Sequence, residues 1–290
     1  MNFWHYLIIF TAILGLTLLA RGLYEPRQLA VTREAITANH KRGNKKQRVR
    51  IALISDLHAD KLWIKPEQIA LELERQPVDL VLFAGDVAGT DQKADEAADF
   101  LKRLAAKLHE TGTPFLAVPG NHDGPRAIAT MRAAGLDVLL NEQRHFNLPD
   151  GKKVLISGLA NQRSKHKGTV DFSAATRLIE KAQLDPAAAG IHIVLVHNPD
   201  AVLDLPVNGA DFLLGGHFHG GQIYAPFGLE FRLLRRDRLP KLGYSRGSFN
   251  IRGYRGYITR GLGCVWLPFR FLSLPELALL ELSVEPEADT

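Results

Sequence analysis

Short apolar runs alternate with segments of helical spacing along most of this chain. Runs such as IALIS, LVLFA, FLAVP, IHIVLV and FLLGG are typical of buried strands, and we expect strands near 50–55, 78–84, 114–118, 153–157, 191–196 and 211–215. Apolar residues at helical spacing predict helices over 66–75, 95–110, 125–134 and 173–183. After residue 220 the pattern changes to short strands broken by Gly and Pro. Strands that alternate with helices indicate an α/β fold.

Histidines and carboxylates gather where these predicted strands end. In chain order the clusters are Asp56-Leu57-His58, Gly85-Asp86, Gly120-Asn121-His122-Asp123, Val196-His197 and Gly216-His217-Phe218-His219. Ligand sites in open α/β sheets lie just beyond the carboxyl ends of the strands. Oxygen ligands mixed with imidazole nitrogens suit divalent first-row metals. Each cluster alone could be an ordinary turn, because Asn and Asp favour turns, but together they predict one metal site.

The blocks DLHAD, AGDVAGT, PGNHDG, VHNPD and GGHFHGGQ resemble the signature blocks of the calcineurin-like metallophosphoesterase superfamily, in the family's order, from about Arg50 to Leu282. The resemblance implies two packed mixed β-sheets flanked by helices, in four αββα layers. It also implies two metal ions. One would be held by Asp56, His58, Asp86 and His219, and the other by Asp86, Asn121, His197 and His217.

A pair of cations suits the hydrolysis of a phosphate ester. Two divalent ions about 3.5–4 Å apart can stabilise the attacking and leaving oxygens, and they acidify a bound water to a pKa of about 7. Asp86 can bridge them because a carboxylate has two oxygens. By resemblance, His122 contacts the phosphate and helps to protonate the leaving oxygen while Asp123 holds its imidazole. The alternative is that Asp123 only ends the turn or starts the next helix. Mn²⁺ is the expected ion, and Fe, Zn or Co would also suit these ligands.

The remaining titratable residues are expected to be solvated or structural. This holds for the histidines outside the clusters, which are His5, His40, His109, His145, His166 and His192. Asp60 follows His58 by two residues. It could hold the metal-binding residues in place without binding the metal itself, or it could be a solvated loop residue. The single cysteine, Cys264, excludes an internal disulfide and is expected to be buried.

The first fifty residues differ from the rest. Phe3 to Ala20 is an uncharged and mostly apolar stretch of eighteen residues, which is near the lower limit for a transmembrane helix. A cleaved signal peptide would carry Lys or Arg before the apolar stretch, and none is present here. A retained anchor is therefore favoured over export. From Arg21 to Arg50 there are nine Lys or Arg residues and two acids. Because basic flanks stay in the cytoplasm, the catalytic domain is expected to face the cytoplasm. The resemblance implies that the membrane is a bacterial inner membrane.

The chain is therefore divided into a transmembrane anchor (1–22), a basic juxtamembrane stem (23–48), a metallophosphoesterase domain (49–284) and a tail (285–290). From Arg21 to Arg50 the net charge is +7, which exceeds the whole chain's net +5. We expect the stem to contact anionic lipid, and no nucleic acid. A second basic segment, 230–260, contains interleaved aromatic residues. It is either an anion-binding rim beside the metals or a solvated, glycine-rich loop.

The chain resembles a bacterial membrane-associated branch of the superfamily. The resemblance lies in the amino-terminal anchor, the blocks HNPD and GGHFHGGQ, and an ending with TRGLG, PFR and PEL. That branch is linked to phosphodiester or pyrophosphate cleavage, including the hydrolysis of UDP-2,3-diacylglucosamine in lipid A synthesis. We expect a membrane-anchored, two-metal phosphodiesterase or pyrophosphatase that acts on a lipid-linked diphosphate. The alternatives are a general phosphoesterase acting on soluble nucleotides or other phosphodiesters, and a non-catalytic membrane scaffold. No oligomeric state is predicted.

Overall fold

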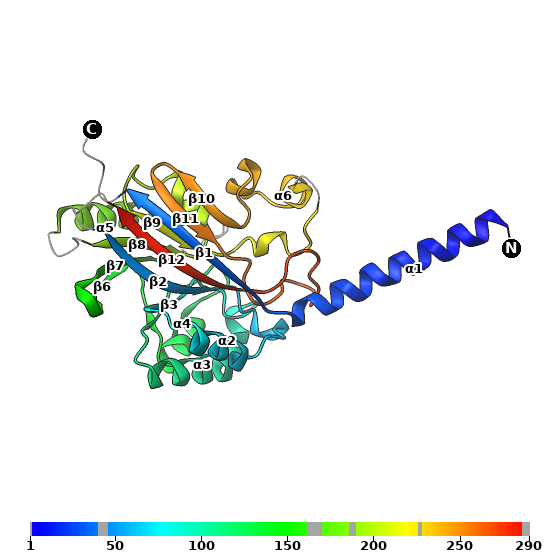
Figure 1. Ribbon diagram of the computed structural model, residues 1–290, viewed down its shortest axis with the longest axis horizontal. Coiled ribbons are helices and arrows are strands. Elements are labelled where there is room, and N and C mark those ends of the chain that lie inside the picture. The colour runs from blue at the N-terminus through cyan, green and yellow to red at the C-terminus, as the bar shows by residue number, and fades with distance from the viewer. Residues whose placement is uncertain (1, 40–45, 162–169, 186–189, 226–227, 286–290) are drawn as a thin grey trace.

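Two six-stranded mixed sheets lie face to face in the computed structural model, which describes residues 2–39, 46–161, 170–185, 190–225 and 228–285 (Figure 1). The first sheet has the order β1 (Ala30–Asn39), β12 (Glu276–Glu285), β2 (Gln47–Ile54), β3 (Leu80–Phe83), β4 (Phe115–Ala117) and β5 (Asp137–Val138). The second has the order β10 (Gly247–Ile251), β11 (Tyr254–Ile258), β9 (Phe212–Gly215), β8 (Ile191–Val196), β7 (Lys153–Leu159) and β6 (Glu142–Asn147). Most pairs are parallel, and β12–β2, β6–β7 and β10–β11 are antiparallel.

Three layers of buried apolar side chains show how the elements stack. One layer joins the outer face of the first sheet to α2 (Pro66–Arg75), α3 (Ala98–Glu110) and α4 (Pro125–Ala133). The second lies between the sheets and includes Leu53 and Ile193. The third joins the second sheet to α5 (Phe172–Leu184). The predicted fold class, two mixed sheets flanked by helices, is confirmed.

Helix α3 illustrates why the apolar spacing dictates this stacking. Phe100, Leu101, Leu104 and Leu108 recur at intervals of three and four, and all are buried against the first sheet. The intervening Lys102, Arg103 and Lys107 side chains are exposed, as expected for an amphipathic helix. The predicted helices and the six predicted strands are all present, with ends shifted by a few residues.

The segment between the anchor and residue 48 differs from the basic stem that the expected domain division assigned to it. Ala30–Asn39 is not only a charged stem, because it forms β1 and pairs with β12 along its whole length. Ile36 and Ala38 are buried while Thr37 and Asn39 are exposed. This is the period of two that a half-buried strand requires, and charge counting does not detect it. Residues 40–45 of the basic run, with His40, lie outside the described residues, as do His166 and the tail from residue 286.

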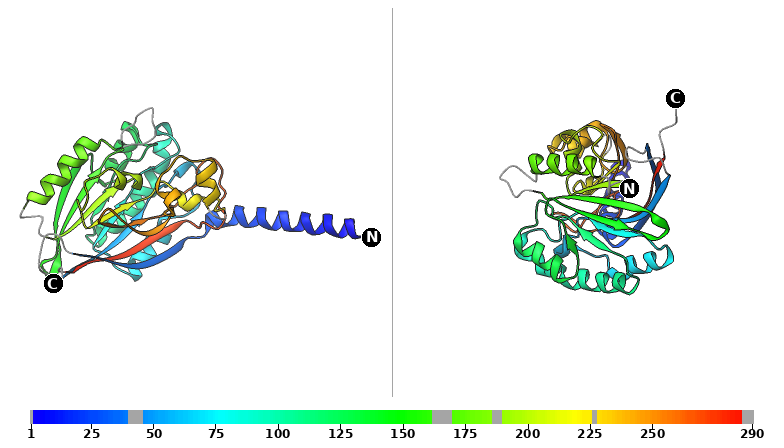
Figure 2. Two further views of the ribbon diagram at one scale, coloured as in Figure 1. Left: turned by 90° about the horizontal axis from the view of Figure 1, so that it is seen from above. Right: turned by 90° about the vertical axis from the view of Figure 1, so that its left-hand side faces the viewer.

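Helix α1 (Phe3–Tyr24) projects away from the two sheets as a single long rod (Figures 1 and 2). With the turn that follows it, Phe3–Arg27 is long and apolar enough to cross a membrane by length and composition. Its last turns rest on the domain. Gly22 is buried against the Phe269 ring, where a Cβ would collide with that ring. The Arg270 N–H donates to the Gly22 carbonyl at 3.0 Å.

Candidate metal centre

The five predicted clusters meet at one edge of the two sheets. Asp56 and His58 follow β2, Asp86 follows β3, and Asn121 follows β4. On the second sheet His197 follows β8, and the pair His217 and His219 follows β9. Because these strands run parallel within each sheet, their carboxyl ends share an edge and the loops beyond them converge.

An unusual backbone conformation recurs among these residues. Asp56, His58, Asp86, His217 and His219 all have φ between 39° and 69°, in the left-handed region that few non-glycine residues adopt. Each such residue costs on the order of 1–3 kcal/mol, and such strain clusters at functional sites. The loops also approach one another closely, since a Cβ on Gly120 would collide with the Asp86 carboxylate.

One group of possible ligands consists of Asp56, His58 and His219, all buried. Asp56 Oδ1 lies 3.3 Å from His219 Nε2 and 4.0 Å from His58 Nε2. Among the described residues Asp56 Oδ1, both His58 ring nitrogens and His219 Nδ1 have no hydrogen-bond partner. Buried polar atoms without partners are rare. A cation held by Asp56 Oδ1 and by one nitrogen of each ring would give several of these atoms a partner, so the residues fit a metal ion.

The second group consists of Asp86, His197 and His217. His197 Nε2 lies 3.2 Å from Asp86 Oδ2 and 3.1 Å from His217 Nδ1. Asn121 Oδ1 is 3.0 Å from the same His197 nitrogen. Four atoms with lone pairs therefore point at one position. A proton shared among them would pair with only some of these atoms, whereas a metal ion could bind all four.

Asp86 lies between the two groups. Its Oδ2 faces His197 at 3.2 Å and His58 at 3.8 Å, while its Oδ1 accepts the His122 N–H at 2.9 Å. All seven side chains predicted as ligands are thus brought together, although they are spread from residue 56 to residue 219 of the sequence.

Burial sets the protonation of three of these histidines. It lowers the pKa values of His58, His217 and His219 below the ordinary 6.5, so their rings are neutral at pH 7 and offer lone pairs. His197 differs, because the Asp86 carboxylate outweighs burial and raises its pKa to about 9. Burial raises the pKa of Asp86 and His197 lowers it by more, so it lies well below its usual range.

Neighbouring groups orient two of the rings. His197 Nδ1 donates to the Ala84 carbonyl at 2.6 Å, which leaves Nε2 free to face Asp86. His217 directs Nδ1 at His197, and its Nε2 lies 3.4 Å from Asp237 Oδ1. A carboxylate behind an imidazole fixes its tautomer and raises its basicity, as is common around metal-binding histidines. Sequence reasoning missed Asp237, whose only signal is that it is one of two acids in the basic segment 230–260.

His122 stands at the edge of the group, with its side chain 36% exposed and its Nε2 4.0 Å from Asp86 Oδ2. The opposite nitrogen, Nδ1, donates to the Gly89 carbonyl at 2.8 Å. The predicted pairing of His122 with Asp123 is wrong. The Asp123 carboxylate instead accepts backbone N–H groups of Asp86, Val87 and Gly120 at 2.7–3.0 Å. Asp123 therefore closes the turn between two loops, and burial with the charge of Asp86 raises its pKa to about 6.

Asp60 helps to position His122 through Gly89. Its Oδ1 accepts the Gly89 N–H at 2.9 Å, and Lys61 and Lys93 pair with its Oδ2. Burial raises the pKa of Asp60, but the Lys61 and Gly89 hydrogen bonds lower it further, to about 2. Gly89 is thus held by Asp60 on its N–H and holds His122 with its carbonyl. The interpretation of Asp60 as a supporting residue agrees with these contacts.

The basic segment 230–260 reaches the centre at one point. Arg235 Nη2 lies 3.4 Å from His217 Nε2, and Arg235 Nε pairs with Asp237 at 2.5 Å. Elsewhere in the segment Arg238 pairs with Asp204 and Arg260 with Glu276. The described part of this segment therefore offers Arg235 to an anion at the centre, rather than a continuous basic rim.

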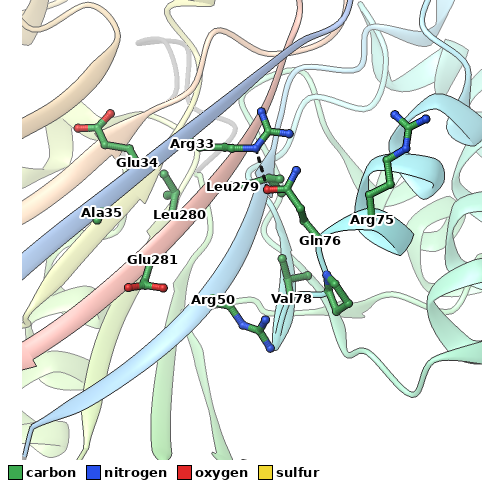
Figure 3. Close-up of a pocket in the computed structure, with 11 residues that line it drawn as sticks. Arg33, Glu34, Ala35, Arg50, Arg75, Gln76, Val78, Leu279, Leu280 and Glu281 are labelled. Carbon is green, nitrogen blue, oxygen red and sulfur yellow. Dashed lines mark hydrogen bonds between the residues drawn. The ribbon is translucent and has the colours of Figure 1, made fainter.

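A groove of about 620 Å³ lies elsewhere, beside β1 and β12 (Figure 3). Its arginines are already paired, because Arg33 donates to Gln76 at 2.7 Å and Arg50 lies 3.6 Å from Asp79. Arg50 is the fourth residue of β2 and Val78 precedes β3 by two residues, while the histidine cluster follows the carboxyl ends of these strands. We therefore do not assign the binding of a substrate phosphate to this groove.

A family model described as calcineurin-like phosphoesterase matches residues 49–221. An uncharacterised metallophosphoesterase of Bacillus subtilis, YkuE, is 30% identical over 80% of this chain and 78% of its own. The phosphodiesterase YaeI of Escherichia coli is 30% identical over 80% of this chain and 82% of its own. The UDP-2,3-diacylglucosamine pyrophosphatase LpxG of Chlamydia trachomatis is 35% identical over 41% of this chain and 37% of its own.

Proposed function

Because the chain belongs to the calcineurin-like phosphoesterase family and is therefore a metal-dependent phosphoester hydrolase, we propose that it is a membrane-anchored phosphodiesterase or pyrophosphatase with two metal ions. The observation that carries the proposal is the position of the Asp86 carboxylate, which faces His58 of one group of possible ligands and His197 of the other. In this assignment Asp56, His58 and His219 hold one ion. His197, His217 and Asn121 hold the other, and Asp86 bridges them.

When bound, the two ions would supply Lewis acidity at the phosphate oxygens and a water ionised near neutral pH. The chain's own residues then have separate tasks. Asp86 keeps its carboxylate ionised beside His197, and Ala84 and Asp237 hold the rings of His197 and His217 in one tautomer each. Arg235 lies where it can neutralise a phosphate oxygen near His217.

His122 is proposed as the group that protonates the leaving oxygen. Because its Nδ1 donates to the Gly89 carbonyl, a proton on Nε2 points toward the candidate metal centre. The exposed edge of the ring leaves room for a substrate. A positioned acid of this kind contributes about 10²–10⁴-fold to the rate. Asp123 is no longer proposed as a partner of His122, and its role is to fix the turn.

A lipid-linked diphosphate is proposed as the substrate, with UDP-2,3-diacylglucosamine as the specific compound. The partial match to LpxG, the diester activity in the name of YaeI and the apolar helix α1 support this choice. We further propose that α1 anchors the chain in a bacterial inner membrane with the domain in the cytoplasm, following the excess of basic residues after the helix. Mn²⁺ is proposed as the native ion.

The test uses the purified full-length protein loaded with Mn²⁺. It is incubated separately with UDP-2,3-diacylglucosamine, with the soluble diester bis(p-nitrophenyl) phosphate and with the monoester p-nitrophenyl phosphate. Release of UMP is the expected result. No UMP with turnover of the soluble diester would reject the lipid substrate and favour a general phosphodiesterase. No turnover of any ester by protein that holds two ions would reject the reaction itself.

A further inference from the structure

Six exposed apolar side chains belong to segments at the end of the domain from which α1 projects. They are Ile223, Leu233, Leu234, Trp266, Leu267 and Leu272, and we refer to them as the collar. Trp266 is 87% exposed and Leu234 is 84% exposed, which is unusual for side chains of this size. They belong to α6 (Leu229–Leu233), its flanks and the loop 263–272. Figure 1 and the left view of Figure 2 place α6 at the end of the domain from which α1 projects.

The collar loop is joined directly to α1. The Arg270 N–H donates to the Gly22 carbonyl at 3.0 Å, and the Phe269 ring covers Gly22. The Arg21 guanidinium lies over the Phe271 ring at 5.3 Å. Wherever the end of α1 meets the membrane surface, the loop 263–272 must meet it as well.

The loop holds its apolar side chains outward instead of folding them away. The buried Arg270 guanidinium donates to the carbonyls of Gly263, Ser273 and Arg260, so the loop is pinned from inside. Trp266 has φ 64° and Leu272 has φ 55°, which is strained backbone for bulky residues. Strain of this kind is stored where it serves a function.

The charge around the collar complements an anionic surface. Arg232 and Arg236 are exposed on the α6 segment beside the collar leucines. Arg246 lies over the Tyr224 ring at 4.1 Å, next to Ile223. Near an anionic bilayer each such residue favours binding, and leucine, tryptophan and arginine together are typical of surfaces that lie in the interface.

The collar is also close to the candidate metal centre. His219 is followed after two glycines by Gln222, whose side chain donates to the Val265 carbonyl at 3.0 Å and accepts the Val265 N–H at 2.6 Å. Ser273 Oγ donates to the His219 carbonyl at 2.8 Å. One loop therefore connects a proposed ligand to the exposed Trp266.

We propose that the collar inserts into the interfacial layer of the anionic bilayer that α1 crosses, and that it holds the metal centre beside the lipid surface. Phosphorylated lipids would then reach the centre from the plane of the membrane. The proposal rests on the anchoring role of α1 put forward above. It adds a second membrane contact that α1 alone does not require.

Tryptophan fluorescence of the full-length protein tests the proposal. The chain has three tryptophans, so W4F/W63F leaves Trp266 as the only reporter. The protein is reconstituted into vesicles of phosphatidylethanolamine and phosphatidylglycerol, with or without phospholipid brominated near the headgroup. We expect the brominated lipid to quench Trp266 strongly and aqueous iodide to quench it weakly.

Two controls use the same vesicles. W4F/W63F/W266F with Leu184→Trp places the reporter at the end of α5, 84% exposed and at the opposite end of the domain from α1 (Figure 1). It should be quenched by iodide and not by brominated lipid. W63F/W266F leaves Trp4 as the reporter of α1 insertion and should be quenched by the lipid.

The outcomes separate the two proposals. Trp266 that behaves like the Leu184→Trp reporter while Trp4 is quenched would overturn the collar and leave the anchor intact. If neither Trp4 nor Trp266 is quenched, both the anchor and the collar are rejected. Quenching of Trp266 without quenching of Trp4 would support the collar as a surface contact and reject the transmembrane anchor.

Discussion

The Asp86 carboxylate directs its Oδ2 at His197 Nε2 over 3.2 Å. The same oxygen is 3.8 Å from His58 Nε2, in the other group of possible ligands. A single carboxylate is therefore in reach of both candidate ion positions, which is the arrangement that a two-metal hydrolase requires.

Replacing this bridge should remove both ions. Asp86→Asn keeps the shape of the side chain and removes its charge, so we expect fewer than two ions per chain and a loss of turnover of at least about a thousand-fold. The matched control is His122→Ala, which should retain both ions and lose about 10²–10⁴-fold in kcat. Metal analysis with diester turnover checks both variants. Two ions and full turnover in Asp86→Asn would overturn the assignment of the bridge.

Asp237 should affect one ion more than the other. Because its carboxylate lies 3.4 Å from His217 Nε2, Asp237→Asn should lower the affinity for the ion held by His197 and His217 by about 10–100-fold. Asp204→Asn is a suitable control, since Asp204 pairs with Arg238 in the same region and touches no proposed ligand. Titration with Mn²⁺ distinguishes the two sites. Equal binding curves for the two variants would show that Asp237 does not orient His217.

Asp60 should act on the rate through Gly89 and His122. Asp60→Ala removes the acceptor of the Gly89 N–H, and we expect kcat to fall about tenfold, which is less than the roughly 10²–10⁴-fold loss expected when the acid–base group itself is removed. KM and metal content should stay unchanged. Asp60→Asn keeps an acceptor oxygen and should restore most of the rate. The control Asp95→Ala removes an exposed ion pair with Arg126 and should have no effect. A loss of metal in Asp60→Ala would instead assign Asp60 to the metal site.

Metal uptake should release a proton. In the metal-free protein the pKa of His197 is raised to about 9, so the ring carries a proton at pH 7 that an ion must displace. Affinity for Mn²⁺ should therefore rise about tenfold per pH unit below pH 9 and level off above it. Calorimetry in two buffers of different ionisation enthalpy measures the proton release. No release at pH 7.5 would mean that His197 is already neutral.

The sequence could predict the longer helices, six of the twelve strands in the described residues and the convergence of the metal-binding side chains, because these follow from apolar periodicity and from residues placed at strand ends. It could not predict contacts set by loops. Asp123 and His122 are adjacent in the sequence, yet the turn directs Asp123 at backbone N–H groups and His122 at Gly89. Asp237 is distant in sequence from His217 and reaches it only through the fold around α6.

The strand β1 shows a second limit of sequence reasoning. The strand carries one Arg and one Glu, and the basic residues on either side of it were the stronger signal in a segment that follows an apolar helix. The partner strand β12 lies near the other end of the chain, so no local pattern indicates the pairing. The collar is similar, because exposure of Trp266 and Leu234 is a property of the surface and not of the local sequence.

The most direct test of the central claim is a crystal structure of the protein loaded with Mn²⁺, with anomalous scattering recorded to locate the ions. We predict two peaks about 3.5–4 Å apart, one among Asp56, His58 and His219, the other among Asn121, His197 and His217, with Asp86 between them. A single peak, or peaks remote from Asp86, would contradict the account.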